Sequence, residues 1–129
     1  MINKKRIDVV AAIIKQGSLF LIAKRSVKQN FPLKWEFPGG KVENNESFEK
    51  ALVREIKEEL CLKVKVLEKL AVEFIKDKEN NLAVHYFYAK IESGVVRLIE
   101  HSDYKWVRKS DFDRYDFILG DKNVLPLIS

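Results

Sequence analysis

Residues 40 to 62 read GKVENNESFEKALVREIKEELCL, and this stretch decides the fold. Apolar residues recur in its second half at the spacing of a helix, at Ala51, Leu52, Ile56 and Leu60. Ser47 precedes them and is a side chain that caps helix N-termini. The pattern therefore predicts a helix over residues 47–60.

Such a helix places Glu55, Glu58 and Glu59 on one face, because residues three and four positions apart are neighbours on a helical surface. Each pair of like charges so placed destabilises an isolated helix by about 0.2–0.5 kcal/mol. Carboxylate oxygens are the ligands that Mg²⁺, Mn²⁺ and Ca²⁺ prefer, and Mg²⁺ is usually held by a few carboxylates together with substrate phosphates. The glutamates thus indicate either a site for a hard cation or a solvated acidic face.

The segment before the helix favours the cation. Residues 35 to 41 read WEFPGGK, a short apolar segment followed by a predicted Pro-Gly-Gly turn. Paired glycines allow positive φ and a close approach of the backbone. We expect this turn to offer carbonyl and N–H groups to a ligand.

These residues resemble the signature box of the Nudix hydrolases. That pattern runs Gly, five residues, Glu, seven residues, Arg-Glu-aliphatic, one residue, Glu-Glu, one residue, Gly-aliphatic. The matching positions are Gly40, Glu46, Arg54, Glu55, Ile56, Glu58, Glu59 and Leu62. Cys61 stands where the pattern has its second glycine, which commonly takes a left-handed conformation after a helix. The cysteine either carries a steric cost or ends the helix differently.

The resemblance implies an α/β fold: a Nudix-type α/β/α sandwich with a mixed β-sheet and a central catalytic loop-helix-loop. It also implies that Glu55, Glu58 and Glu59 hold Mg²⁺, or Mn²⁺ as a substitute, together with a carbonyl of Gly39 or Gly40. Glu55 is the candidate for ligand and general base.

Three further charged residues of the box and its loop have candidate roles. Arg54, Glu55 and Glu58 are the candidate catalytic residues. Within this set, Arg54 is expected to fix the orientation of a carboxylate. Glu43 and Glu46 lie on the loop before the helix, where Glu46 either supports the loop or takes an outer metal site.

Within the family, residues 35–43 look most like the MutT-type nucleoside triphosphate pyrophosphohydrolases, and the match in length and order covers nearly the whole chain. The resemblance implies substrate-binding roles for Arg25, Phe37, Lys41 and Asp121, with Lys41 near a phosphate and Asp121 at the base edge. It also implies that Glu100, in a loop before Trp106, is an additional metal ligand. The alternatives are a strand-end charge for Arg25, a loop residue for Glu100 and a helix cap for Asp121.

Composition agrees with one compact domain over residues 1–129. With 129 residues and 47% hydrophobic content, the chain can bury one core. Cys61 is the only cysteine, which excludes an internal disulfide and a cysteine-based zinc cluster, and a reduced, cytoplasmic chain is the simplest inference. The apolar run at residues 9–14 is too short for a signal peptide or a membrane span and is interpreted as a buried strand.

The net charge of +5 fits an anionic substrate without selecting one. Aromatic residues are not interleaved with basic ones as in a platform for single-stranded nucleic acid, so we expect no nucleic-acid partner apart from a capped RNA end. We expect no membrane partner, and either a monomer or a homodimer.

The remaining segments predict two hairpins and a short C-terminal helical region. Strands are expected at 7–15 and 18–24, at 64–75 and 82–91 joined through residues 76–81, and at 104–107, with a polar loop at 26–34. Ser110 is expected to cap a short helix at 111–115, and residues 120–121 to open a last helix that Pro126 shortens or kinks. The aromatic residues expected in the core are Phe20, Phe74, Tyr86, Phe87 and Tyr88. His85 and His101 receive no role.

The leading functional hypothesis is Mg²⁺-dependent hydrolysis of a nucleoside triphosphate, including oxidised or non-standard nucleotides, to a nucleoside monophosphate and pyrophosphate. A second keeps the chemistry but changes the substrate to ADP-ribose, a dinucleoside polyphosphate or capped RNA. A nucleotide-binding module without catalysis and a small basic nucleic-acid-binding domain are the alternatives from other classes.

Overall fold

The computed structural model describes residues 5–76 and 79–129. Its strands are β1 (Lys5–Gln16), β2 (Leu19–Lys24), β3 (Trp35–Glu36), β4 (Gly39–Lys41), β5 (Lys63–Lys76), β6 (Asn80–Ser93) and β7 (Asp103–Arg108). Its helices are α1 (Phe48–Leu60), the 3₁₀ helix η1 (Lys109–Arg114), α2 (Leu119–Val124) and the 3₁₀ helix η2 (Leu125–Leu127). None of the helices among these residues is long and apolar enough to cross a membrane.

The sheet is mixed and has β1 at its centre. The strand order is β3-β2-β1-β6-β5, with β4 paired to β1 and β7 paired to β2. β1 runs parallel to β6, from the pair Lys5↔Asn80 to the pair Ile14↔Ala89, and antiparallel to β2 and β4. β5 is antiparallel to β6, while β3 and β7 are antiparallel to β2.

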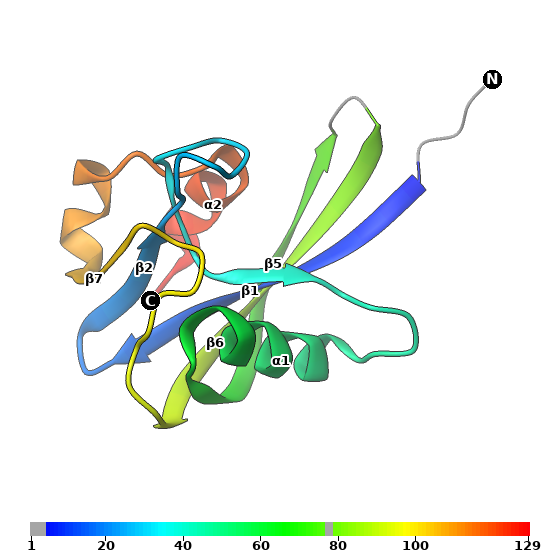
Figure 1. The fold of residues 1–129 in the computed structure, drawn as a ribbon. Coiled ribbons are helices and arrows are strands. Elements are labelled where there is room, and N and C mark those ends of the chain that lie inside the picture. The colour runs from blue at the N-terminus through cyan, green and yellow to red at the C-terminus, as the bar shows by residue number, and fades with distance from the viewer. Residues whose placement is uncertain (1–4, 77–78) are drawn as a thin grey trace.

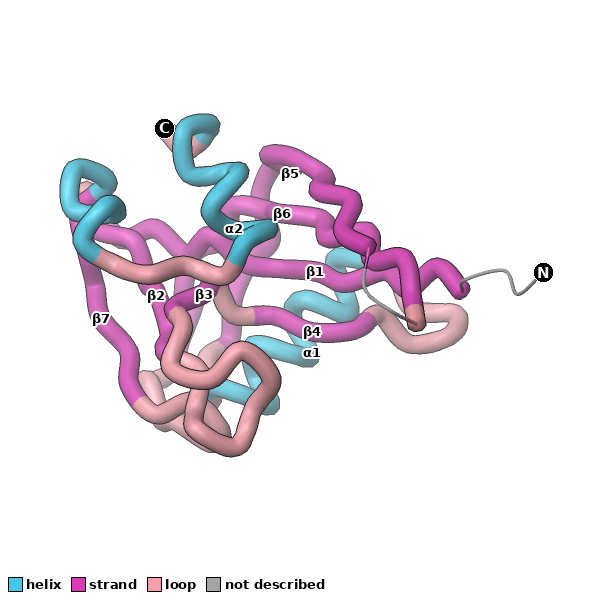
Figure 2. The backbone as a smooth tube through the Cα atoms, turned by 90° about the horizontal axis from the view of Figure 1, so that it is seen from above, coloured by secondary structure: helices cyan, strands magenta, loops and turns pink. Residues whose placement is uncertain are grey.

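Helices cover both faces of this sheet, as Figures 1 and 2 show, with α1 and α2 on opposite sides of β1. Successive side chains of β1 alternate between two cores: Ala11 and Ile13 pack with Val124 of α2, whereas Ala12 and Ile14 pack beneath α1. Because both faces are covered, β1 has a continuous apolar run rather than an alternating one. This arrangement confirms the predicted α/β/α sandwich with a mixed sheet.

Helix α1 forms where its sequence pattern predicts. The Ser47 hydroxyl accepts a hydrogen bond from the Lys50 N–H at 3.1 Å, and the predicted apolar positions are all buried. The helix ends at Cys61, which adopts the left-handed conformation (φ 60°, ψ 29°) and donates its N–H to the Lys57 carbonyl. Cysteine therefore takes the backbone conformation that glycine favours at this position.

The segment around Gly39 and Gly40 is a strand, β4, and the predicted turn is wrong. Gly40 pairs with Val10 of β1, and Gly39 pairs with Ala11. Pairing with β1, which is distant in the sequence, therefore holds this segment in an extended conformation. Neither glycine has positive φ. Gly39 is required for space, because a Cβ there would collide with the Val10 carbonyl, whereas a Cβ at Gly40 would displace the Glu55 carboxylate.

The two predicted hairpins are present, and residues 77–78 of the second connection lie outside the described residues. Phe20, Tyr86 and Phe87 are buried as predicted, and Tyr88 is half-buried. Phe74 is 74% exposed, so its predicted place in the core is wrong. It lies on the edge strand β5, where the guanidinium of Arg6 stands over its ring.

The C-terminal region differs from the prediction in its caps. Ser110 lies inside η1, whose N-cap residue is Arg108 with no side-chain capping bond, so the predicted capping role of Ser110 is wrong. The last helix, α2, begins at Leu119 rather than at Gly120. Pro126 falls in η2, which continues directly from α2.

Candidate active site

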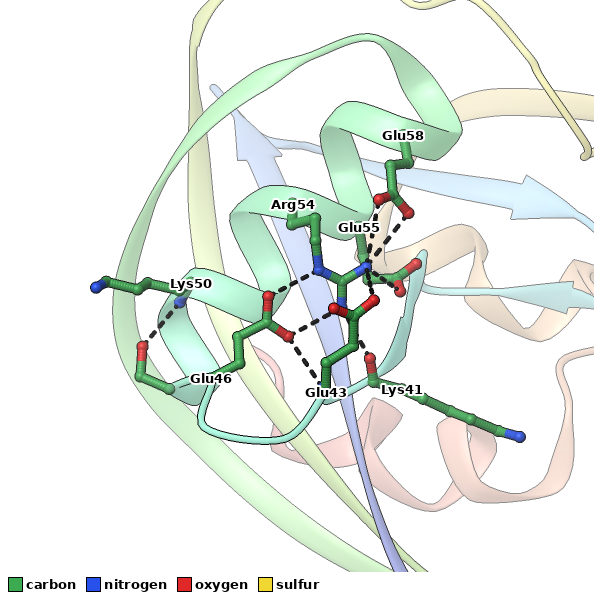
Figure 3. Close-up of polar contacts among 8 residues, drawn as sticks. Lys41, Glu43, Glu46, Lys50, Arg54, Glu55 and Glu58 are labelled. Atoms are coloured by element: carbon green, nitrogen blue, oxygen red, sulfur yellow. Dashed lines mark hydrogen bonds and ion pairs between the residues drawn. The ribbon is translucent and has the colours of Figure 1, made fainter.

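Arg54 of α1 stands at the centre of a group of carboxylates (Figure 3). Its Nε and Nη2 donate to the two oxygens of Glu46 at 2.7 and 2.9 Å, a bidentate arrangement. Its Nη1 donates to Glu55 Oε1 at 2.9 Å and lies 3.3 Å from Glu58 Oε2. The guanidinium thus offsets the mutual repulsion of these carboxylates and fixes their orientation.

The same arginine ties the preceding loop to the helix. Arg54 Nη2 donates to the Lys41 carbonyl at 3.0 Å, and Glu46 accepts the Glu43 N–H at 3.0 Å. The hydrogen bond from Arg54, followed by that from Glu43, lowers the pKa of Glu46 to about 2. These contacts agree with the structural role expected for Arg54 and with loop support by Glu46.

The carboxylate of Glu55 lies against the backbone of β4. A side chain at Gly40 would occupy the space of this carboxylate, so the glycine admits it. Burial raises the pKa of Glu55, and the repulsion from Glu58 and Glu43 adds to the increase, while Arg54 opposes it. Only 14% of the Glu55 side chain is exposed.

Glu59, the third glutamate of the predicted cluster, differs from Glu55 and Glu58 in its hydrogen bonding. Its Oε2 atom is buried and has no hydrogen-bond partner within residues 5–76 and 79–129. Burial, followed by the charges of Glu36, Glu55 and Glu100, raises the pKa of Glu59 to about 8. The helix therefore presents one pair of glutamates that Arg54 holds and one glutamate with an unpaired buried oxygen.

This donor set fits a divalent cation in its chemistry. Among the described residues, no three or more aspartate, glutamate, histidine or cysteine side chains are arranged so that they could hold a metal ion. The unpaired oxygen of Glu59, close to other carboxylates, nevertheless lacks the partner that a buried carboxylate requires. An oxygen-preferring cation such as Mg²⁺ would supply that partner.

A second polar network lies beside Glu59 and joins two loops. The buried carboxylate of Glu36 accepts from Arg25 Nη1 at 2.9 Å on one oxygen and contacts His101 Nε2 at 2.8 Å on the other. Arg25 also donates from Nε to the Asn30 carbonyl. The sequence identifies neither Glu36 nor His101 as a site residue, because these two residues meet only through the fold and carry no spacing signal.

The structure places the predicted substrate-binding residues in different settings. Phe37 is 2% exposed, and its ring packs with Phe112 and Phe117 in the core. The side chain of Lys41 extends away from Arg54 (Figure 3). Arg25 is bound to Glu36 as described above, and Glu100 is exposed on the segment between β6 and β7.

Asp121 is almost fully buried and joins three parts of the fold. Its carboxylate accepts from the Phe37 N–H at 2.7 Å and from the Tyr86 hydroxyl at 2.6 Å. Burial raises the pKa of Asp121 to about 7, against the opposing effect of these two hydrogen bonds. The N-cap of α2 is Ile118, so the interpretation of Asp121 as a helix cap is wrong.

Comparison with known proteins agrees with this geometry. The model of the NUDIX domain family matches residues 4–128. The chain is 33% identical over 124 residues to a CTP pyrophosphohydrolase of Escherichia coli K12, covering 96% of this chain and 90% of that protein. It is 32% identical over 126 residues to an 8-oxo-dGTP diphosphatase of Buchnera aphidicola, covering 91% and 88% of the two chains.

A solved structure supports the same relationship. The solution structure of the Escherichia coli ORF135 protein has a TM-score of 0.85 and 32% sequence identity, and the match covers 96% of this chain and 89% of that one. The match to the family model over almost the whole chain and the likeness to these relatives lead to one conclusion. This chain belongs to the Nudix family of hydrolases.

Proposed function

We propose that this protein hydrolyses a nucleoside triphosphate to a nucleoside monophosphate and pyrophosphate, with Mg²⁺ as cofactor and Mn²⁺ as a substitute. The observation that carries the proposal is the unpaired, buried oxygen of Glu59 among neighbouring carboxylates on the helix of the Nudix box. The names of two relatives, a CTP pyrophosphohydrolase and an 8-oxo-dGTP diphosphatase, support a nucleoside triphosphate as the substrate.

The metal is proposed to be held by the carboxylates of Glu55, Glu58, Glu59 and Glu100 and by a carbonyl of Gly39 or Gly40. Bound Mg²⁺ would neutralise phosphate charge and lower the pKa of a coordinated water. The other tasks belong to the chain itself. Arg54 keeps Glu55 and Glu58 oriented, which supports its inclusion in the catalytic set.

Glu55 is proposed to accept the proton of the attacking water. Burial raises the pKa of Glu55, and Arg54 donates to its Oε1 at 2.9 Å, which fixes the orientation of the carboxylate. The water oxygen attacks the β-phosphorus, and the bond between this phosphorus and the oxygen that bridges it to the α-phosphorus breaks. The bridging oxygen leaves with the nucleoside monophosphate, and the β- and γ-phosphoryl groups leave as pyrophosphate.

We propose that Arg25, Phe37, Lys41 and Asp121 shape the nucleotide site. The resemblance to the MutT-type proteins supports this assignment. Asp121 accepts a hydrogen bond from the Phe37 N–H, and Arg25 donates one to the neighbouring Glu36. Arg25 and Asp121 therefore hold the two residues that lie just before β4. The contribution of Phe37 is proposed to be the placement of that segment, since its ring is buried.

We also propose that residues 1–129 form a single Nudix domain that acts in the cytoplasm, as a monomer or homodimer. The extent of the family match supports the single domain. The single cysteine is in keeping with a reducing compartment.

The test is release of pyrophosphate and phosphate from a panel of canonical and oxidised nucleoside triphosphates, ADP-ribose, dinucleoside polyphosphates and capped RNA. Each substrate is assayed with and without Mg²⁺. Pyrophosphate release from a triphosphate that requires Mg²⁺ is the expected result. Turnover confined to ADP-ribose, a dinucleotide or capped RNA overturns the substrate, and no turnover by the folded protein favours a binding role.

A further inference from the structure

His101 is buried in an arrangement that the proposed reaction does not yet use. None of its side chain is exposed, and its Nε2 lies 2.8 Å from one oxygen of Glu36. Arg25 binds the other oxygen of Glu36 at 2.9 Å. One carboxylate on the short strand β3 is therefore held between the end of β2 and the segment that precedes β7.

The backbone of that segment is fixed to α1 on one side of Glu100. The Ile99 N–H donates to the Glu59 carbonyl at 3.2 Å, and the Arg97 N–H donates to the Leu60 carbonyl at 3.0 Å. The residue before Glu100 is thus bonded to the backbone of the glutamate that has the unpaired oxygen.

Contacts on the other side of Glu100 fix the segment to β2 and β3. His101 contacts Glu36, and the Ser102 N–H donates to the Lys24 carbonyl at 2.9 Å. Glu100 is the exposed residue between these two sets of contacts, and it directly follows Ile99, whose N–H is bonded to the Glu59 carbonyl. The position of the Glu100 backbone is consequently set by its two neighbours.

The His101 contact leaves one polar atom unsatisfied. Nδ1 of His101 is buried and has no hydrogen-bond partner in the described part of the chain. A buried polar atom without a partner destabilises the folded state. The contact with Glu36 uses only one ring nitrogen, so half of the hydrogen-bonding capacity of the buried imidazole is unused.

We propose that His101 is a positioning residue which, through Glu36, holds Glu100 beside Glu59 so that both carboxylates can bind one divalent cation. This proposal rests on the proposed function and goes beyond it, because it gives His101 and Glu36 a role in metal binding. The chain then has two positioning networks, with Arg54 acting on Glu55 and Glu58 and the Glu36 network acting on Glu100.

The test measures binding of Mn²⁺ by electron paramagnetic resonance in His101→Phe, which keeps an aromatic ring but removes the contact with Glu36. His101→Gln is the rescue variant, because its amide N–H can donate to Glu36. His85→Phe is the matched control. His85 is also buried, and its Nε2 lies 3.0 Å from a carboxylate oxygen, that of Asp8, but His85 is not part of the glutamate site.

We expect His101→Phe to weaken Mn²⁺ binding about 10- to 100-fold, the range seen when a group that orients a metal ligand is lost. His101→Gln should bind within about threefold of the unmodified protein, and His85→Phe should not change Mn²⁺ binding. The effect of His101→Phe should disappear in a Glu100→Gln background, because the contact acts through Glu100.

Equal Mn²⁺ binding by His101→Phe and His85→Phe overturns the proposal, as does an unchanged effect in the Glu100→Gln background. Absence of Mn²⁺ binding by the unmodified protein also overturns it, since there is then no ion for Glu100 to bind. The substrate panel decides the proposed function separately, because Mn²⁺ binding is measured without substrate.

Discussion

Arg54 serves four acceptors with one side chain, and the geometry of the guanidinium makes this possible. It binds Glu46 through two N–H groups and reaches Glu55, Glu58 and the Lys41 carbonyl with the others. A lysine has a single ammonium group and cannot reproduce a bidentate contact together with these others.

Arg54→Lys should therefore lower the free energy of unfolding by about 2 kcal/mol, the contribution of a lost hydrogen bond to a charged group. Urea denaturation monitored by fluorescence measures the change. Arg114→Lys is the control, because Arg114 is 77% exposed and contacts Asp111 only at 3.7 Å. Equal stability of the two variants would show that Arg54 does not hold the loop.

Glu58 is the more exposed of the two helix glutamates that Arg54 contacts, with 58% of its side chain accessible. Glu58→Gln keeps the size of the side chain and removes the charge that a cation requires. We expect it to fold normally and to lose about 100-fold or more in Mg²⁺-dependent kcat/KM.

Glu49→Gln, in the exposed first turn of the same helix, is the control for this variant and should keep full activity. The two proteins are compared by steady-state kinetics at several Mg²⁺ concentrations and by thermal unfolding. Full activity of Glu58→Gln would remove Glu58 from the metal site.

At the scale of the element, the residue that follows α1 adopts a left-handed backbone conformation, which is unusual for a residue other than glycine. Cys61 has φ of 60°, and the left-handed region costs a residue with a Cβ roughly 1 kcal/mol relative to glycine. Cys61→Gly should raise the free energy of unfolding by about 1 kcal/mol, and Cys61→Ala should not. Chemical denaturation of both variants decides this, and equal stability of the two would show that the conformation at the helix end is not strained.

Elements whose signals are local could be predicted from the sequence. The capping serine, the apolar spacing of α1 and the Gln16-Gly17 connection act within a few residues, and the structure contains each of them. β4 was not predicted, because its extended form depends on pairing with β1. Phe74 was misplaced because the composition of a strand does not show which part of a sheet is covered.

The candidate site likewise contains contacts that local spacing predicts and contacts that only the fold creates. Arg54, Glu55 and Glu58 follow a fixed spacing on one helix, so the contacts of Arg54 with Glu55 and Glu58 were accessible from the sequence. The contact of Arg54 with Glu46 depends on how the preceding loop folds against the helix. The contact of His101 with Glu36 joins residues far apart in the chain and has no local signal. The buried, unpaired oxygen of Glu59 depends on how deeply the helix is buried, which the spacing of glutamates does not give.

At the scale of the whole molecule, Asp121 connects α2 to the Phe37 backbone and to Tyr86 of β6. Its pKa is about 7 in the folded protein, compared with an ordinary value of 3.8. Between these two values the folded state keeps a proton that the unfolded state has released. This contribution to stability is complete below pH 3.8 and is lost as the pH rises toward 7, with a slope of up to about 1.4 kcal/mol per pH unit.

Asp121→Asn should remove this slope, because an amide does not titrate and can still accept the Phe37 N–H. The free energy of unfolding, measured by urea denaturation at several pH values from 4.5 to 8, should then fall less with pH in the variant than in the unmodified protein. Parallel curves would show that Asp121 is ionised throughout this range.

The position of β1 at the centre of the sheet also affects how the chain folds while it is being synthesised. β1 is made before the other described strands, yet its long parallel neighbour β6 is made only with residues 80–93. Parallel pairing between segments so far apart forms slowly, because a long loop must close first. A nascent chain that ends before β6 therefore carries an apolar strand without its main partner, and we expect such chains to bind chaperones until β6 is made.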